Sequence, residues 1–478
     1  MLTQDYASAK FKPVIDNGVR HPFVTLRLQD IEIPLLDAKR ASVDPTYAGT
    51  GPLNVQPLFL DSLQHEVKTM NTGSNLLSLR VLDPSFDYLD SLIFTKIKEL
   101  NFNGLTVQYG WRGRDDGFVT STAPINLYLH EIGVEVFPNR GTMVTLTCTD
   151  LSAELFSGSH HLSFKEDDRI SDVIGEAIRK ILPRLEFNID PITTPVGALK
   201  NMEGASLGRY ILSLLESSAP STGGQPLFTV TIDPPESADG RSLLRIKSYK
   251  PEAAERTYVY GRSRDGEMLS FTPSINLRAM ARLAGGRATA VSIDPVTKTW
   301  IRDESTMRED RTVGPKRSVA TPQTPTDNLE CPMSPAAAKA IVEGSRANAD
   351  QTMWEGSATV MGDVGLRPYK PIKIIVLKND PTASGEVTHA DANAIHWASS
   401  GVWTPYVVTH QIEDGVFHTL LTMYRNAGFV GEGTDGVPLD RGLFDTADLD
   451  VSGKAISRVT PLSNPDQLTG NAGVWNPI

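Results

Sequence analysis

The chain of 478 residues has few cysteines, no excess of basic residues and no long apolar run. Its two cysteines, Cys148 and Cys331, are too few for a disulfide scaffold and suit a chain assembled in a reducing cytoplasm. Lys and Arg number 46 against 57 Asp and Glu, and the resulting net charge of -11 disfavours tight DNA wrapping, which needs a basic face. The aliphatic runs, as at 374–377, are far shorter than the roughly 20 apolar residues of a spanning helix. The first ten residues lack the basic head and apolar stretch of a signal peptide, so no ordinary secretion signal is predicted.

Alternation of apolar and polar residues dominates the first 155 residues. It runs through 23–36 and 143–149, and shorter β-forming runs occupy 105–109 and 134–136. Such alternation is typical of strands with one buried face, so this region is predicted to be mainly β. One helix is expected to interrupt it after Asp83 and Pro84, because apolar residues then follow at spacings of three and four up to Leu100.

Two amphipathic helices are predicted in the middle of the chain. The first begins at Ser171 and Asp172 and ends before Pro183, and the second covers 207–215. Their apolar stripes could pack on each other or on a neighbouring sheet. Strands are expected to resume beyond residue 226.

The later β segments are expected at 227–232, 243–248, 257–260, 268–272 and 288–293. A turn at Asp265 and Gly266 predicts that the third and fourth of these form a hairpin.

The charged run at 302–317 is interpreted as a solvated loop, and the Pro- and Thr-rich residues 321–327 as a linker. Ser334 and Pro335 then begin an Ala-rich helix that reaches about residue 354.

The sharpest local signal is a hairpin near the C-terminus. Two β-forming runs, 406–412 and 416–423, flank Asp414 and Gly415, a dipeptide that favours tight turns. A further strand is predicted at 372–377.

Histidines are the first candidates for chemistry. His160 and His161 are adjacent, and His410 and His418 lie on opposite arms of the predicted hairpin, where they could face each other. A zinc site needs a third and a fourth ligand at fixed distance, and the sequence identifies neither. Cross-strand polar residues are therefore the preferred interpretation.

Acidic residues give no firm site either. Asp445, Asp448 and Asp450 resemble a fragment of a calcium loop, but the central Gly and terminal Glu of an EF-hand are missing, so a solvated acidic arm is preferred. A glycosidase needs two carboxylates at a defined separation, which sequence alone does not fix. The residues considered for such a pair are Glu99, Asp115, Asp116 and Glu131. No catalytic residue, metal ligand or cofactor is therefore predicted.

The order of the elements is similar to that of one known family. The chain resembles the baseplate (tail) hub proteins of contractile-tail bacteriophages, a group related to phage late control protein D and to the hub part of type VI secretion VgrG. The segments that carry the resemblance are 105–111, 163–174, 206–218, 260–273, 362–376 and 406–426. The charged insert and the residues after 427 have no counterpart in this pattern.

The resemblance implies a mainly β protein with helices (α+β), in which two tube-protein-like β-barrel domains are joined by a helical linker. The implied division is 1–155 first barrel, 156–225 helical linker, 226–300 β-rich region, 301–356 charged insert and Ala-rich helix, 357–426 second barrel with closing hairpin, and 427–478 extended arm.

The resemblance also implies a non-enzymatic virion protein of the tail baseplate, made and assembled in the host bacterial cytoplasm. It would form a homotrimeric ring that joins the sixfold tail tube to the threefold central spike, next to tape measure and baseplate wedge proteins. DNA would pass through the ring without specific binding, and no membrane insertion is expected. An acidic channel wall would suit this passage, because it would not bind phosphates. The alternatives are a tail-associated peptidoglycan hydrolase and a host-surface glycan-binding protein.

Overall fold

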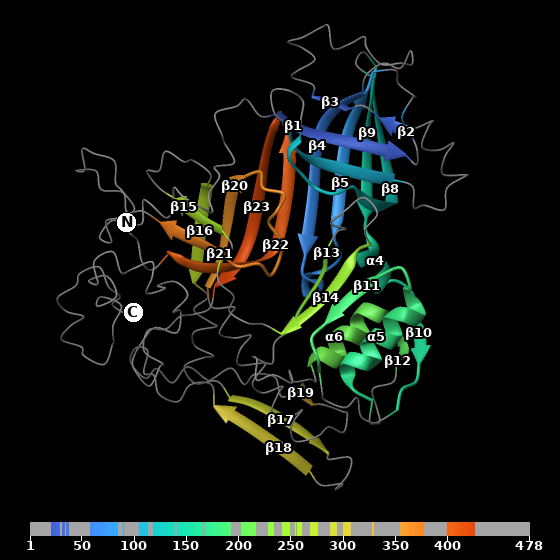
Figure 1. Ribbon diagram of the computed structural model, residues 1–478, viewed down its shortest axis with the longest axis vertical. Coiled ribbons are helices and arrows are strands. Elements are labelled where there is room, and N and C mark those ends of the chain that lie inside the picture. Colours follow the sequence, from blue (N-terminus) through green and yellow to red (C-terminus); the bar gives the residue numbers. More distant parts are fainter. Residues whose placement is uncertain are drawn as a thin grey trace, which may run out of the picture.

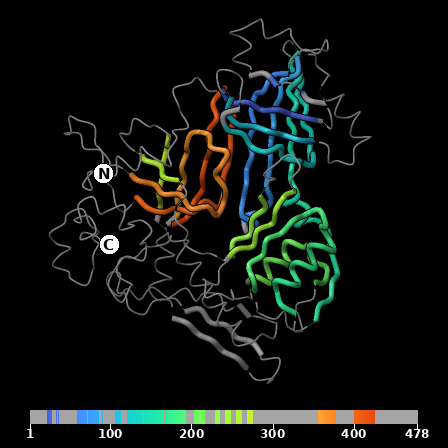
Figure 2. Tube along the Cα trace, in the orientation of Figure 1, coloured from blue at the N-terminus to red at the C-terminus, as the bar shows by residue number. Residues whose placement is uncertain are grey.

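The structure is a computed structural model, and it describes residues 21–28, 31–33, 35–37, 58–84, 89, 105–112, 118–138, 141–165, 168–192, 202–216, 228–233, 241–248, 254, 256–260, 268–275, 287–293, 300–306, 327–328, 354–376 and 399–425 (Figure 2). Within these residues, strands far outnumber helices, so the prediction of a mainly β protein with some helix is confirmed. The described strands form one large sheet and three small ones, and they do not close into a barrel. The two predicted β-barrel domains are therefore replaced, in the described residues, by one continuous sheet that the pairing of residues 62–68 with residues 407–413 holds together. None of the described helices has the length and apolar run that a membrane crossing requires.

The large sheet contains fifteen strands, mostly antiparallel, in the order β16-β20-β23-β22-β4-β5-β9-β8-β6-β1-β2, with β3, β7, β15 and β21 attached at its sides (Figure 1). We call the first nine strands the N-terminal strands: β1 (His21–Leu28), β2 (Ile31–Ile33), β3 (Leu35–Asp37), β4 (Leu58–Lys68), β5 (Leu76–Asp83), β6 (Leu105–Arg112), β7 (Phe118–Ser121), β8 (Ile125–Phe137) and β9 (Gly141–Thr149). The others are the C-terminal strands: β15 (Arg256–Tyr260), β16 (Met268–Ile275), β20 (Trp354–Met361), β21 (Ile372–Val376), β22 (Gly401–Glu413) and β23 (Val416–Arg425).

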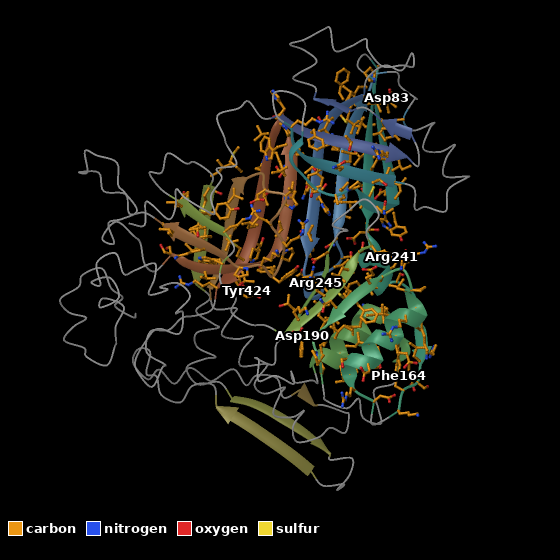
Figure 3. All side chains as sticks on the ribbon, viewed as in Figure 1. Asp83, Phe164, Asp190, Arg241, Arg245 and Tyr424 are labelled. Atoms are coloured by element: carbon orange, nitrogen blue, oxygen red, sulfur yellow. The ribbon has the colours of Figure 1, made fainter. Side chains whose placement is uncertain are left out.

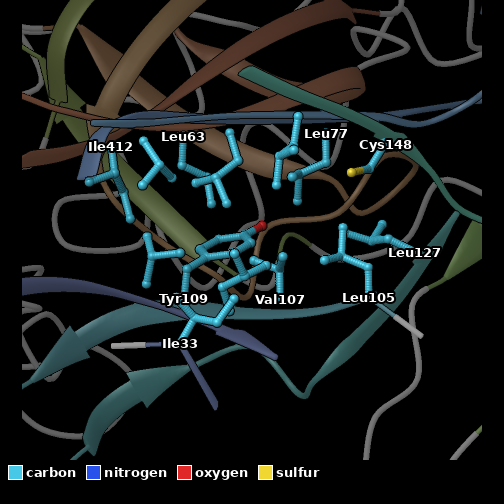
Figure 4. Close-up of a cluster of buried hydrophobic side chains, with 14 of the residues drawn as sticks. Ile33, Leu63, Leu77, Leu105, Val107, Tyr109, Leu127, Cys148 and Ile412 are labelled. Atoms are coloured by element: carbon cyan, nitrogen blue, oxygen red, sulfur yellow. The ribbon is translucent and has the colours of Figure 1, made fainter. Parts of the chain in front are cut away.

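The N-terminal strands form two layers because β8 passes from one to the other. Residues 125–127 of β8 pair with β6, and residues 128–137 pair with β9. The layer of β1, β2, β6 and β7 thus covers one face of β4, β5 and β9 (Figure 1). Alternate residues of each strand fill the core between the layers (Figure 4). Its fully buried members include Leu26, Leu63, Leu79, Val107, Tyr109, Val144, Leu146 and Phe417.

The two groups of strands meet where β22 pairs with β4, a pairing that we call the seam. Its antiparallel register runs from Val407 opposite Lys68 to Glu413 opposite Ser62. The seam joins segments about 340 residues apart in sequence into one continuous sheet. Ile412 and Phe417 of the C-terminal strands consequently belong to the core of the N-terminal strands.

The predicted C-terminal hairpin is confirmed. β22 and β23 pair around Asp414 and Gly415, whose φ angles of 55° and 73° both lie in the left-handed region that tight two-residue hairpin turns require. The predicted hairpin between 257–260 and 268–272 is wrong. Both segments are strands, but β15 pairs with β21 and β16 pairs with β20, because a local turn signal does not specify the partner of a strand.

Below the N-terminal strands lies a separate α/β unit, the linker body (Figure 1). Its elements are α4 (Leu151–Phe156), β10 (His160–Leu162), α5 (Ile170–Ile181), β11 (Glu186–Ile189), β12 (Met202–Ala205), α6 (Leu207–Glu216), β13 (Phe228–Asp233) and β14 (Leu243–Ser248). Both predicted helices are confirmed, and α5 ends before Pro183 as expected. Their apolar stripes pack on each other and on β13 and β14, since Ile174, Ile178, Ile211, Val230 and Leu244 belong to one buried cluster.

The segment around 300 differs from expectation. Residues 300–306 form β18 (Trp300–Thr306), which pairs with β17 (Arg287–Ile293), so the prediction of a loop is wrong for the first residues of the charged run. Edge strands tolerate charged residues well, which explains the mismatch. β17 also pairs with β19 (Asp327–Asn328). Most of the predicted helices at 83–100 and 334–354 lies outside the described residues. Of the first, the structure describes Asp83, which ends β5, Pro84 and Leu89; of the second, it describes Trp354, which begins β20.

Candidate functional site

His410 and His418, which could have faced each other across the hairpin, do not. In the hairpin register His410 lies opposite Thr419, and His418 lies opposite Gln411, so the two histidines are on opposite faces of the sheet. His418 is half-buried on the open face, where its Nε2 lies 3.2 Å from Gln411 Oε1. His410 is fully buried on the core face and lies directly opposite His65 across the seam.

His65, Tyr109, His410 and Thr419 form a buried polar group beneath the seam, which we call the seam cluster. His65 Nδ1 lies 2.7 Å from the Tyr109 hydroxyl. The two histidine rings are 6.3 Å apart between centroids, and the Tyr109 ring is 5.7 Å from that of His410. The cluster therefore brings together one residue from each of β4, β6, β22 and β23.

Burial controls the protonation of the seam cluster. Burial, helped by the positive charge of Arg367, lowers the pKa of His65 to about 3. Burial also lowers the pKa of His410 well below its ordinary value, with smaller contributions from His65 and Arg367. Both imidazoles are consequently neutral near pH 7, and burial raises the pKa of the Tyr109 hydroxyl far above its ordinary value, so it keeps its proton.

Thr419 Oγ1 links His410 to the turn after β20. It accepts from the backbone N–H of Asp363 at 3.1 Å and lies 3.1 Å from His410 Nδ1. The Nε2 atom of His410 is buried and has no hydrogen-bond partner among the described residues. The cluster thus contains no charged group and no paired acid and base.

A second polar group extends the cluster toward β15. The Asp363 carboxylate pairs with Arg256, accepts from the Tyr258 hydroxyl at 3.1 Å and accepts from the Gly365 N–H at 2.9 Å. The neighbouring Gly362 accepts from the Trp111 indole at 2.7 Å. These bonds fix the turn after β20 against both groups of strands.

The other sequence candidates do not assemble into a site. His160 is half-buried and His161 exposed on β10, and Glu131 is exposed on β8. Cys148 is buried, and burial raises the pKa of its thiol to about 12. Across the described part of the chain, no group of three or more His, Cys, Asp and Glu side chains could hold a metal ion. The remaining candidates lie outside the described residues: Glu99, Asp115, Asp116, Cys331, Asp445, Asp448 and Asp450.

The large sheet has an open face opposite its core. On this face alternate residues of β20, β23, β22, β4, β5, β9 and β8 are exposed or half-exposed. One row across it, read from the strand registers, consists of His418, Gln411, Gln64, Ser78, Thr147 and Glu131. Hydroxyl and amide side chains thus make up most of this row, and Leu76, Val416 and Leu420 are exposed elsewhere on the same face.

The charges of the open face are few and mostly negative. Lys68 pairs with Glu66 at 2.9 Å, and Arg80 pairs with Asp61 at 3.4 Å. The further carboxylates on the same face are Glu131, Glu135, Glu355 and Glu413. Both cations are therefore matched by a carboxylate beside them, and the surplus charge is acidic.

The open face ends in two strand edges. Residues 131–137 of β8 pair with β9 and with no other described strand, and β16 pairs with β20 alone among the described strands. Both edges expose aliphatic side chains, since Val134, Val136 and Leu269 are 44%, 62% and 51% exposed. Unpaired edges with apolar side chains are suited to pairing with another strand.

Sequence reasoning missed His65, Tyr109 and Thr419. Each sits at an ordinary position of an alternating strand, and only the long-range pairing of β4 with β22 brings them together. Trp111 and Trp403 are buried in the core.

No protein-family model matches the sequence, and no curated protein matches it. Solved structures do resemble the fold. A tail protein from Neisseria meningitidis MC58 is 9% identical, with a TM-score of 0.51 over 85% of this chain and 97% of that one. The 43 kDa tail protein of prophage MuSo2 from Shewanella oneidensis is 10% identical, with a TM-score of 0.47 over 85% and 98%. The c3393 protein of Escherichia coli, a type VI secretion component, is 7% identical, with a TM-score of 0.44 over 78% and 74%.

The TM-score of 0.51 with the tail protein from Neisseria meningitidis indicates a common architecture. Because the two sequences are only 9% identical, this similarity concerns the fold alone. It spans nearly the whole of the tail protein, so it includes both groups of strands and the linker body rather than one motif. The chain therefore shares the fold of a phage tail protein, which confirms the structural resemblance that its sequence predicts.

Proposed function

We propose that the chain is a structural hub subunit of a phage tail baseplate, without catalytic activity. Three copies would form a ring that joins the sixfold tail tube to the threefold central spike and encloses the channel for the tape measure and for DNA. The N-terminal and C-terminal strands would each supply one tube-like β unit, so that three chains give six similar units. The observation that carries this proposal is the open, hydroxyl-rich face of a sheet that spans both groups of strands.

The open face suits a channel wall. Its Thr, Ser and Gln side chains are short and uncharged, and its surplus charge is acidic. A wall of this kind offers no basic stripe to which DNA phosphates would bind. DNA would therefore move along it without being held.

The strand edges support closure of the ring. Inside the chain, the seam already joins two groups of strands by edge-to-edge pairing. The same kind of pairing between β8 of one copy and β16 of the next would continue the sheet from chain to chain. Such head-to-tail contacts generate a closed ring when the rotation between successive copies adds up to a full turn.

Native mass tests the proposal directly. Light scattering or mass photometry at micromolar concentration should give three times the chain mass of 52.1 kDa. Replacement of Val134 and Val136 by Glu should convert the trimer to a folded monomer, because both side chains are exposed at the β8 edge. Leu420→Glu is the matched control, since Leu420 is 37% exposed within the open face and away from either edge.

If the variant with Glu at positions 134 and 136 remains a trimer, the contact between subunits does not use the β8 edge. A monomeric wild type would contradict the ring itself, provided that the tube and spike proteins were present. Zymography tests separately whether the chain lacks catalytic activity, because a clearing zone on peptidoglycan would contradict a purely structural role.

A further inference from the structure

Tyr369 lies in a turn between β20 and β21 and has an unusual backbone. Its φ angle is 69°, in the left-handed region, and of the described residues other than glycine it shares this region only with Asp414 of the hairpin turn. Its backbone N–H donates to the Pro405 carbonyl of β22 at 2.8 Å. A bulky side chain in this conformation carries strain that the surroundings must offset.

The side chain of Tyr369 reaches out of the C-terminal strands into the linker body. Its hydroxyl donates to Asp233 Oδ2 at 2.9 Å, at the end of β13. The same oxygen accepts from Arg245 of β14, which lies where the linker body approaches the large sheet (Figure 3). Burial, with the Asp233 charge next to it, raises the pKa of Tyr369 well above its ordinary value, so the hydroxyl remains a donor.

The contact with Asp233 leaves polar atoms unpaired. Asp233 is 7% exposed and its Oδ1 has no hydrogen-bond partner among the described residues. The same holds for Oγ1 of Thr231, which lies two residues earlier on β13 and is 1% exposed. Buried polar atoms without partners are rare, because they have lost their water without compensation. Movement of β13 away from the turn would return Asp233 Oδ1 to water.

The linker body is held more firmly by the N-terminal strands. Met70, just after β4, is buried in the core of the linker body. Asn75 donates its side-chain amide to Asp150 at 2.7 Å and its backbone N–H to Ser152 at 2.7 Å. This attachment thus combines shared core packing with several hydrogen bonds, and it leaves no strained residue.

We propose that the bond between Tyr369 and Asp233 is a conformational latch between the linker body and the C-terminal strands. When the bond is closed, the linker body is docked against both groups of strands. When it opens, the linker body keeps its attachment at Met70 and Asn75 and tilts away from the turn that carries Tyr369. Release returns Asp233 Oδ1 to water, and this gain opposes the loss of the bond.

Distances between spin labels test the latch. Cys331 is replaced by Ser, and the buried Cys148 is left in place. One label sits at Glu186 in the linker body, and the second sits either at Glu355 in the C-terminal strands or at Thr72, next to the attachment; all three residues are exposed. Tyr369→Phe, which removes only the hydroxyl, should broaden the distance distribution between 186 and 355 and broaden that between 186 and 72 much less, because residue 72 lies beside the pivot.

Tyr258→Phe is the matched control. It also removes a tyrosine hydroxyl that donates to a buried carboxylate, but the acceptor, Asp363, belongs to the C-terminal strands. This variant should leave both distributions unchanged. An unchanged 186–355 distribution in Tyr369→Phe would overturn the latch, and so would equal broadening of both distances or the same broadening in Tyr258→Phe.

Discussion

His65 and His410 lie opposite each other on neighbouring strands of the seam, and both are buried as neutral imidazoles. One residue comes from the N-terminal strands and the other from the C-terminal strands, so their protonation state bears on the contact between the two. Their surroundings contribute the positive charge of Arg367 and the hydroxyls of Tyr109 and Thr419. Among the described residues, no carboxylate forms an ion pair with either ring.

The first prediction is that mild acid weakens the seam. Both histidines have folded-state pKa values below the ordinary 6.5, so the unfolded chain binds protons that the folded chain does not. Stability from this source is complete above pH 6.5 and falls as the pH drops toward about 3 for His65. Each histidine contributes a slope of up to about 1.4 kcal/mol per pH unit, so the free energy of unfolding should drop by roughly 3–4 kcal/mol between pH 7 and pH 5.

Urea unfolding at several pH values measures this drop. The double variant His65→Gln and His410→Gln should show a much weaker pH dependence over the same range. His418→Gln is the control, because His418 is only half-buried and lies on the open face. If the double variant keeps the wild-type slope, other groups cause the acid sensitivity.

The sequence predicts the local parts of this architecture well. Asp414 and Gly415 identify the hairpin, and the apolar stripes identify α5 and α6, because turn chemistry and helical spacing are local properties. The faces of the hairpin are harder to assign. A two-residue turn pairs residues whose numbers sum to 829, as Glu413 with Val416, so His410 lies opposite Thr419 and cannot lie opposite His418. An error of one residue in the assumed register therefore reverses the face.

The seam could not be predicted in the same way. The alternation in β4 does not identify β22, about 340 residues away, as its partner, because any strand with a similar alternation would fit as well. The seam cluster depends on this pairing, so His65 and Tyr109 carried no signal as isolated residues. The short hydroxyl side chains of the open face are visible in the sequence, for example at Thr145 and Thr147, but only the completed sheet shows that they share a surface.

The second prediction concerns the hydroxyl of Thr419. Thr419→Val keeps the shape of the side chain and removes the group that bonds both the Asp363 N–H and His410 Nδ1. Because these buried partners would be left unpaired, the free energy of unfolding should fall by about 1–3 kcal/mol. Thr409→Val, on the half-exposed open face of the adjacent strand, should change it by less than about 0.5 kcal/mol. Equal effects of the two substitutions would contradict a special role for the buried hydroxyl.

The third prediction concerns the close contact between Gly362 and Phe417. A Cβ atom at Gly362 would lie 2.2 Å from the Phe417 ring, which is itself fully buried in the core. Gly362→Ala should therefore displace the ring, weaken the bond from Trp111 and lower the free energy of unfolding by about 2–4 kcal/mol. Gly133→Ala is the matched substitution, since its Cβ would meet only Thr145 at an ordinary 3.6 Å. Thermal unfolding of the two variants separates these cases, and an unimpaired Gly362→Ala would mean that Phe417 has room to move.

The last prediction concerns the charge of the open face. If the acidic surplus keeps DNA from binding, reversal of that surplus should create binding, so a variant with Glu66, Glu131 and Glu135 changed to Lys should retain double-stranded DNA at low salt. The control variant has three lysines in the linker body instead, in place of Asp172, Glu186 and Glu203. Its net charge equals that of the open-face variant, but the added positive charges lie on another surface. Electrophoretic mobility shifts across salt concentrations compare them, because phosphate contacts weaken steeply as salt rises. Binding by the open-face variant alone would show that position matters as well as net charge. Equal binding by both variants would mean that the overall charge of -11, rather than the open face, keeps the wild type off DNA.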